Sequence, residues 1–130
     1  MNVYLDIDGV LLANDNNAAN HVHDFLQKVL AGGNTVYWLT THCQGDARTA
    51  VARLARVFPG KSLELTKGIL PTSWEKAKTE AINFSQPFLW FDDEREELEK
   101  HNALDNWIEV DLANNPDKLR DFVVSFPIPV

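Results

Sequence analysis

The sequence has very little cysteine: Cys43 is the single one among 130 residues, so no disulfide can form within the chain. A lone thiol is typical of proteins in a reducing compartment, and we expect a cytoplasmic protein. No apolar run approaches the roughly 20 residues that a membrane-spanning helix needs. We therefore expect no contact with a membrane.

Positive charge is also scarce. The sequence has 12 Lys and Arg residues and 19 Asp and Glu residues, which gives a net charge of −7. Such a chain offers no broad basic surface, and this disfavours long duplex nucleic acid as a partner. An anionic substrate can still bind where a metal ion and a few cations focus the field. The hydrophobic content of 45% is that of an ordinary globular protein, and the length predicts one domain over residues 1–130.

Apolar runs and helical stripes alternate along the chain. We expect a short charged helix over 94–100 and a last helix from 115 to about 125. The other predicted elements are strands at 2–7, 35–40, 62–66, 87–91 and 107–110, and helices at 18–31, 47–57 and 73–84. Near-continuous apolar strands separated by helices are typical of a parallel sheet covered on both faces. We therefore predict a single Rossmann-like α/β domain with three layers and a mainly parallel, five-stranded sheet.

Polar side chains collect where the three strongest predicted strands end. In an open parallel sheet, ligands bind beyond the carboxyl ends of the strands. Three polar clusters at one edge therefore indicate a binding site. They are Asp6 with Asp8, Thr40 with Thr41, and Asp92 with Asp93.

The first cluster has the pattern Asp-x-Asp-Gly. Alternation along a strand places Asp6 and Asp8 on the same side, where two like charges require a proton or a cation between them. Magnesium suits this arrangement because it prefers oxygen ligands and binds one or two carboxylates together with waters and a phosphate. Gly9 would let the backbone turn sharply and approach a ligand. A strand that runs into a solvated Asp-Gly turn is the alternative.

The other two clusters also allow two interpretations. The hydroxyl of Thr40 can donate to a phosphoryl oxygen, or it can bond to the local backbone. Asp92 and Asp93 are adjacent and should point in opposite directions, so both cannot reach one metal ion equally. They can also begin a solvated acidic helix. Phosphoryl transfer needs a cation as well, and the candidates are Lys67, Lys76 and Lys78.

Together these segments resemble the motifs of the haloacid dehalogenase-like (HAD) phosphatases. The matching segments, in order over residues 3–93, are VYLDIDGVL, VYWLT, a lysine and PFLWFDDE. The resemblance implies that Asp6 is the nucleophile and forms an aspartyl-phosphate. It implies that Asp8 is the general acid and base and gives its backbone carbonyl to Mg²⁺. Thr40 would bind the phosphate.

The resemblance also assigns the remaining site residues. Asp93 would be a magnesium ligand supported by Asp92 and Glu97. Lys78 fits the phosphate-binding lysine by its spacing to the next strand, with Lys76 as the alternative. We expect the substrate to contact Gly9, Thr41 and His42. Leu11 departs from the family, since many members have threonine there.

The expected function is magnesium-dependent hydrolysis of a phosphomonoester. The segments between Asp8 and Thr40, and between Thr41 and Lys78, are too short for a large cap domain. Family members without a cap tend to act on large substrates or borrow a partner subunit that covers the open site. We therefore expect a macromolecular or nucleotide phosphate as substrate. Two alternatives are a receiver domain, which would need an adjacent acid pair after its first strand, and a catalytically weak HAD-fold binding or scaffold protein.

Overall fold

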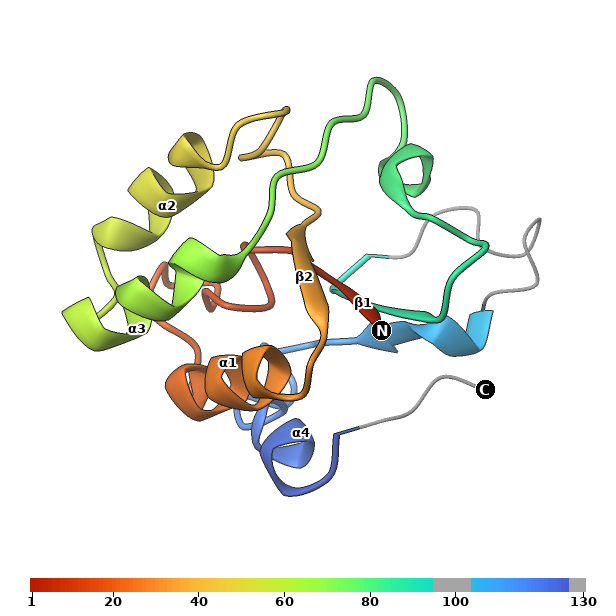
Figure 1. The fold of residues 1–130 in the computed structure, drawn as a ribbon. Coiled ribbons are helices and arrows are strands. Elements are labelled where there is room, and N and C mark those ends of the chain that lie inside the picture. Colours follow the sequence, from red (N-terminus) through yellow and green to blue (C-terminus); the bar gives the residue numbers. More distant parts are fainter. Residues whose placement is uncertain (95–103, 127–130) are drawn as a thin grey trace.

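The computed structural model describes residues 1–94 and 104–126. Within them a parallel sheet has the strand order β2-β1-β3-β4 (Figure 1). All three strand pairings are parallel, which confirms the predicted α/β class. The sheet has four strands rather than the predicted five. They are β1 (Asn2–Leu5), β2 (Thr35–Trp38), β3 (Phe88–Asp92) and β4 (Trp107–Glu109).

The predicted strand at 62–66 is wrong, because this segment is helical. It lies in α3 (Gly60–Leu65) and the 3-10 turn η1 (Thr66–Gly68). Ser62 and Thr66 are both buried at a spacing of four residues, which is the period of a helix and not of a strand. The edge strand β2 instead makes a single parallel bridge, between Tyr37 and Leu70.

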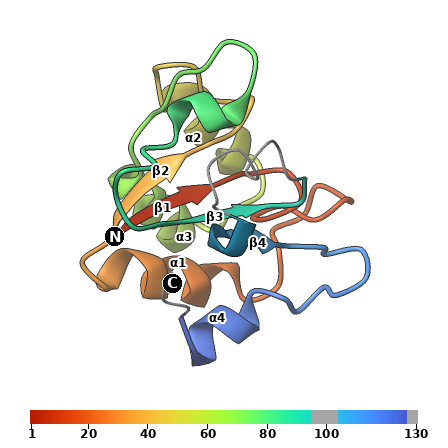
Figure 2. The same ribbon diagram turned by 90° about the vertical axis from the view of Figure 1, so that its right-hand side faces the viewer.

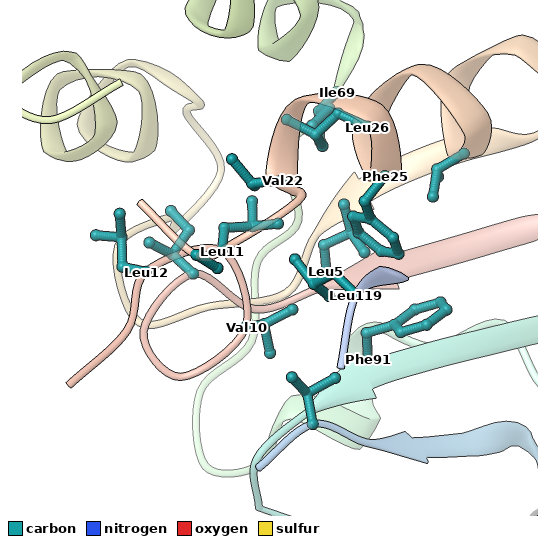
Figure 3. Close-up of a cluster of buried hydrophobic side chains, with 14 of the residues drawn as sticks. Leu5, Val10, Leu11, Leu12, Val22, Phe25, Leu26, Ile69, Phe91 and Leu119 are labelled. Atoms are coloured by element: carbon teal, nitrogen blue, oxygen red, sulfur yellow. The ribbon is translucent and has the colours of Figure 1, made fainter. Parts of the chain in front are cut away.

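Within the described residues, four α-helices contribute to one hydrophobic core, on one face of the sheet. Figure 2 shows α1 and α4 below the strands. Figure 3 shows Phe25 of α1 beside Leu5 of β1 and Phe91 of β3, with the Phe25 and Phe91 rings edge to face at 5.3 Å. Besides α3, these helices are α1 (Val22–Ala31), α2 (Arg48–Ala55) and α4 (Arg120–Val124).

The other face of the sheet carries a second, aromatic cluster that includes Tyr4, Phe88 and Trp90. The segment 71–87 contributes Trp74, Ile82 and Phe84 to this cluster, and Figure 1 shows it in green, on the side of the sheet away from α1 and α3. The helix predicted over 73–84 is absent from it, and only a 3-10 turn, η2 (Lys78–Ala81), forms. Within the described residues the second covering layer therefore contains no α-helix.

A carboxylate holds the backbone just before this 3-10 turn. Glu80 accepts hydrogen bonds from the backbone N–H groups of Glu75, Lys76 and Ala77 at 3.2, 2.9 and 2.7 Å. Such local bonds from a side chain give the backbone an alternative to helical hydrogen bonding.

The helix boundaries also differ from those predicted. Helix α1 begins at Val22 and not at residue 18, because His21 has a left-handed backbone with φ 66°. Helix α4 begins at Arg120 and not at residue 115, since turns occupy most of 112–119. Most of the helix predicted over 94–100 lies outside the described residues. In the part of the chain that the structure describes, no helix combines the length and the apolar character needed to cross a membrane.

Candidate functional site

The ends of three neighbouring strands meet at one edge of the sheet. Leu5 is level with Trp38 and with Phe91 in the parallel register, so the residues that follow each strand emerge together. An open cleft of about 380 Å³ lies there. The residues that line it are Asp6, Asp8, Thr41, Trp74, Lys76, Lys78, Asp92, Asp93 and Glu94.

Three carboxylates converge in this cleft. Asp6, Asp92 and Asp93 each offer an oxygen, and these oxygens lie within 4.8 Å of one another. Asp6 and Asp92 are buried, whereas Asp93 is exposed. Burial and the negative charge of Asp6 raise the pKa of Asp92 to about 8. The negative charges of these carboxylates repel one another, and Mg²⁺ prefers oxygen ligands, so the three side chains fit a magnesium site.

Lys78 lies between two of these carboxylates. Its Nζ is 2.7 Å from Asp92 Oδ2 and 3.3 Å from Asp6 Oδ2. Burial on its own would lower the pKa of Lys78, but the charges of Asp6 and Asp92 outweigh it and raise the pKa. Trp90 Nε1 donates to the same Asp92 oxygen at 3.2 Å, and the backbone N–H of Glu94 donates to the other at 3.1 Å. The structure thus places Lys78, of the two candidate lysines, against the carboxylates.

Lys76 lines the same cleft but does not reach the carboxylate cluster. The residue between the lysines, Ala77, is extended with φ −139° and ψ 140°. Side chains two apart in an extended backbone point to the same side, so both lysines face the cleft. The third candidate, Lys67, pairs with Glu64 at 2.9 Å and is not among the lining residues.

Asp8 is held by a histidine and an arginine side chain. His42 Nε2 lies 2.7 Å from Asp8 Oδ2, and Arg53 Nη2 lies 3.1 Å from Asp8 Oδ1. The same guanidinium nitrogen donates to Asn16 Oδ1 at 2.7 Å. Burial would raise the pKa of Asp8, but the hydrogen bonds and charges of His42 and Arg53 lower it.

Sequence reasoning missed Arg53. The sequence did contain a signal for Arg53. Ala50 and Leu54 form the buried stripe of α2, and Arg53 is three residues after Ala50 and directly before Leu54. A charged residue at the edge of an apolar stripe is partly turned toward the protein. His42, which we expected to touch substrate, contacts the carboxylate of Asp8.

The two threonines differ in their access to the cleft. Thr41 is exposed and lines it. Thr40 is buried, and its hydroxyl accepts the backbone N–H of His42 at 3.3 Å. This bond is the local backbone role that the sequence left open for Thr40.

Gly9 is placed against a carboxylate. Its φ is +85°, and a Cβ at this position would lie 2.6 Å from Asp93 Oδ2. A side chain would therefore clash with Asp93 as well as strain the backbone. Leu11, at the position where the HAD motif often has threonine, is fully buried in the main core. Glu97 lies outside the described residues.

Comparison of the chain with protein-family models, with curated proteins and with solved structures finds no match. The function proposed below therefore depends on the geometry of the cleft and on the resemblance of the motifs.

Proposed function

We propose that this chain is a magnesium-dependent phosphomonoester hydrolase of the HAD-like type, which acts through an aspartyl-phosphate. One observation carries the proposal. Asp6 lines an open cleft with Lys78 and the Asp92–Asp93 pair beside it and with Asp8 in the same lining. A nucleophile, a cation, a metal-binding carboxylate set and a proton carrier are the parts that phosphoryl transfer to a carboxylate requires.

Asp6 is the nucleophile. The backbone N–H of Ile7 donates to Asp6 Oδ1 at 2.8 Å and fixes the carboxylate, while Lys78 lies 3.3 Å from the other oxygen. In the first step an oxygen of Asp6 forms a bond to phosphorus, and the bond from phosphorus to the leaving alcohol breaks. Lys78 balances negative charge beside the transferring group.

Asp8 moves the protons. In the first step it protonates the leaving oxygen, and in the second it takes a proton from the water that attacks the aspartyl-phosphate. Attack by this water breaks the bond between Asp6 and phosphorus and releases inorganic phosphate. Arg53 and His42 keep Asp8 ionised at rest, as its lowered pKa requires. His42, at 2.7 Å, is a group that can supply the proton for the first step.

Asp6, Asp93 and the backbone carbonyl of Asp8 would hold Mg²⁺, with Asp92 and Lys78 supporting the carboxylates. Bound there, the ion would neutralise charge on the phosphoryl oxygens. No strand or helix lies between β1 and α1, and only α2, α3 and η1 lie between β2 and η2. This open arrangement supports a macromolecular or nucleotide phosphate as the substrate.

Phosphate release from a panel of phosphomonoesters, with Mg²⁺ and with a chelator, tests the proposal. The wild type should release phosphate only with Mg²⁺, and Asp6→Asn should lose turnover by about a thousandfold or more, since it keeps the shape and loses the nucleophile. Asp46→Asn is the matched control, because Asp46 bonds to Arg48 outside the cleft. Equal phosphate release above background by the wild type and Asp6→Asn, with both proteins folded, would refute the role of Asp6. Absence of phosphate release by the folded wild type with Mg²⁺ would favour the catalytically weak binding or scaffold protein.

A further inference from the structure

The two lysines of the cleft have different surroundings. Lys78 has a side chain that is 13% exposed, and both of its carboxylate partners are buried. Lys76 is exposed, and its ammonium forms no ion pair with any residue in 1–94 or 104–126. The charge of Lys76 helps to lower the pKa of Glu80 without an ion pair. A cation that lines a cleft for a phosphate ester and is not ion-paired there is available to an anion of the ligand.

Trp74 stands beside Lys76 in the same lining. Its side chain is partly buried against the aromatic cluster of the second face. The indole Nε1 is buried and finds no hydrogen-bond acceptor within the described part of the chain. The accessible portion of the indole ring is therefore carbon, which suits contact with a flat, apolar group.

Residues 72–76, which carry Trp74 and Lys76 and form the rim of the cleft, are held by hydrogen bonds at both ends. The backbone N–H of Trp74 donates to Gln44 Oε1 at 3.1 Å, and Thr72 O accepts from Gly45 N at 2.7 Å. On the other side, Glu80 binds the N–H of Lys76 at 2.9 Å. A rim tied by backbone hydrogen bonds presents its side chains without the cost of ordering a loop.

We propose that Trp74 and Lys76 form a subsite for the leaving group, and that this subsite selects esters whose alcohol carries an aromatic ring and a second anionic group. The inference rests on the proposed phosphatase function. The chemistry is that of a nucleotide with a second phosphate, either free as a nucleoside bisphosphate or at the phosphorylated end of an oligonucleotide. Contact of a base with an aromatic side chain changes affinity by about five- to a hundredfold.

Four substrates that release phosphate from the same kind of primary alcohol separate these contributions. They are ribose 5-phosphate, adenosine 5′-monophosphate, adenosine 3′,5′-bisphosphate and a short 5′-phosphorylated single-stranded oligonucleotide. In kcat/KM for loss of the 5′-phosphate, we expect adenosine monophosphate to exceed ribose phosphate by about tenfold or more. The bisphosphate should exceed the monophosphate by a further factor of about five. Comparison of the bisphosphate with the oligonucleotide shows whether the enzyme prefers a free nucleoside bisphosphate or the phosphorylated end of an oligonucleotide.

Two variants assign the preferences to their residues. Trp74→Leu should shrink the ratio of adenosine monophosphate to ribose phosphate toward one, and Trp74→Phe should retain it because the ring is kept. Lys76→Gln should shrink the ratio of bisphosphate to monophosphate. Lys67→Gln is the matched control, since it removes the same charge from outside the cleft lining, and it should leave both ratios unchanged.

Ratios that stay at the wild-type values in Trp74→Leu and Lys76→Gln, or equal losses on all four substrates, would overturn the subsite and leave the phosphatase proposal standing. Absence of turnover on every substrate would overturn the phosphatase proposal instead. In that case calorimetry with Asp6→Asn still tests the subsite, through tighter binding of the bisphosphate than of ribose phosphate. Equal affinities there would count against the subsite by themselves.

Discussion

Replacing Lys78 by methionine removes the cation from between two buried carboxylates while keeping much of the side chain's bulk. The ammonium lies 2.7 and 3.3 Å from the carboxylate oxygens of Asp92 and Asp6, whose side chains are 1% and 10% exposed. Removal of one partner from a buried ion pair costs about 3–5 kcal/mol, because the other charge stays buried. In Lys78→Met this cost depends on pH, since Asp92 can avoid its charge by binding a proton.

The sign of the pH effect follows from the pKa of Asp92. In the wild type the folded-state value is raised from 3.8 to about 8. Between these values the folded protein holds a proton that the unfolded chain has lost, so its stability falls as the pH rises. Loss of Lys78 raises the pKa of Asp92 further and extends this fall above pH 8. We expect a loss of about 1–2 kcal/mol near pH 6 and about 2.5–3.5 kcal/mol near pH 9, since linkage adds at most about 1.4 kcal/mol over this range.

Urea unfolding of chelator-treated protein at the two pH values measures these losses. Lys76→Met is the matched control, because Lys76 is exposed and outside the carboxylate cluster, and its loss should stay within about 0.5 kcal/mol. Mg²⁺ should restore part of the stability of Lys78→Met, since a divalent ion bound only by the folded state supplies the missing charge. Equal losses in the two lysine variants, or a Lys78→Met loss that does not grow with pH, would refute this account of the cluster.

Three further predictions concern the same edge of the sheet. Gly9→Ala should weaken Mg²⁺ binding by about tenfold or more in calorimetry, because the added Cβ would displace the carboxylate of Asp93. Gly45→Ala is the control: Gly45 has φ +81° and open space around it, so this variant should lose stability and keep its Mg²⁺ binding. Mg²⁺ binding near pH 7 should release protons, because burial and the charge of Asp6 raise the pKa of Asp92 to about 8, and a binding enthalpy that is the same in buffers of different ionisation enthalpy would contradict this. Arg53→Met should raise the pKa of Asp8 and so move the basic limb of the kcat/KM profile to higher pH, because the first step needs a proton on Asp8; an unmoved limb would show that Arg53 does not act on Asp8.

The strand ends were predictable from the sequence because their signals are local. The run before Asp6 is apolar, and Asp6 follows directly after β1, so its place at the end of a strand depends only on neighbouring residues. The run that ends at Asp92 is buried throughout the strand. Parallel pairing then brings such ends to one edge, whatever the details of the connections.

The segment 62–66 and the contact of Arg53 were not predicted, because their signals are not local hydrophobic patterns. In residues 62–66, Leu63 and Leu65 alternate with polar residues as in a strand, yet the helix buries Ser62 and Thr66 instead. Both buried hydroxyls have partners, His23 at 2.8 Å and the backbone carbonyl of Leu63 at 2.6 Å. Burial of a polar side chain with a satisfied hydrogen bond leaves no trace in a hydrophobic pattern. Likewise, Arg53 reaches Asp8 across 45 residues, a pairing that only the tertiary fold creates.

The failed helix over 73–84 is also what gives the cleft its second cation. In an α-helix, residues two apart point about 200° from each other, so Lys76 would have faced away from the carboxylates that Lys78 binds. The extended backbone at Ala77 places both lysines on the same side. The sequence left a choice between the two lysines because a helix allows only one of them to reach the site. With the backbone extended at Ala77, Lys78 binds the carboxylates and Lys76 remains available to the ligand. The two lysines therefore have different roles and do not compete for the same one.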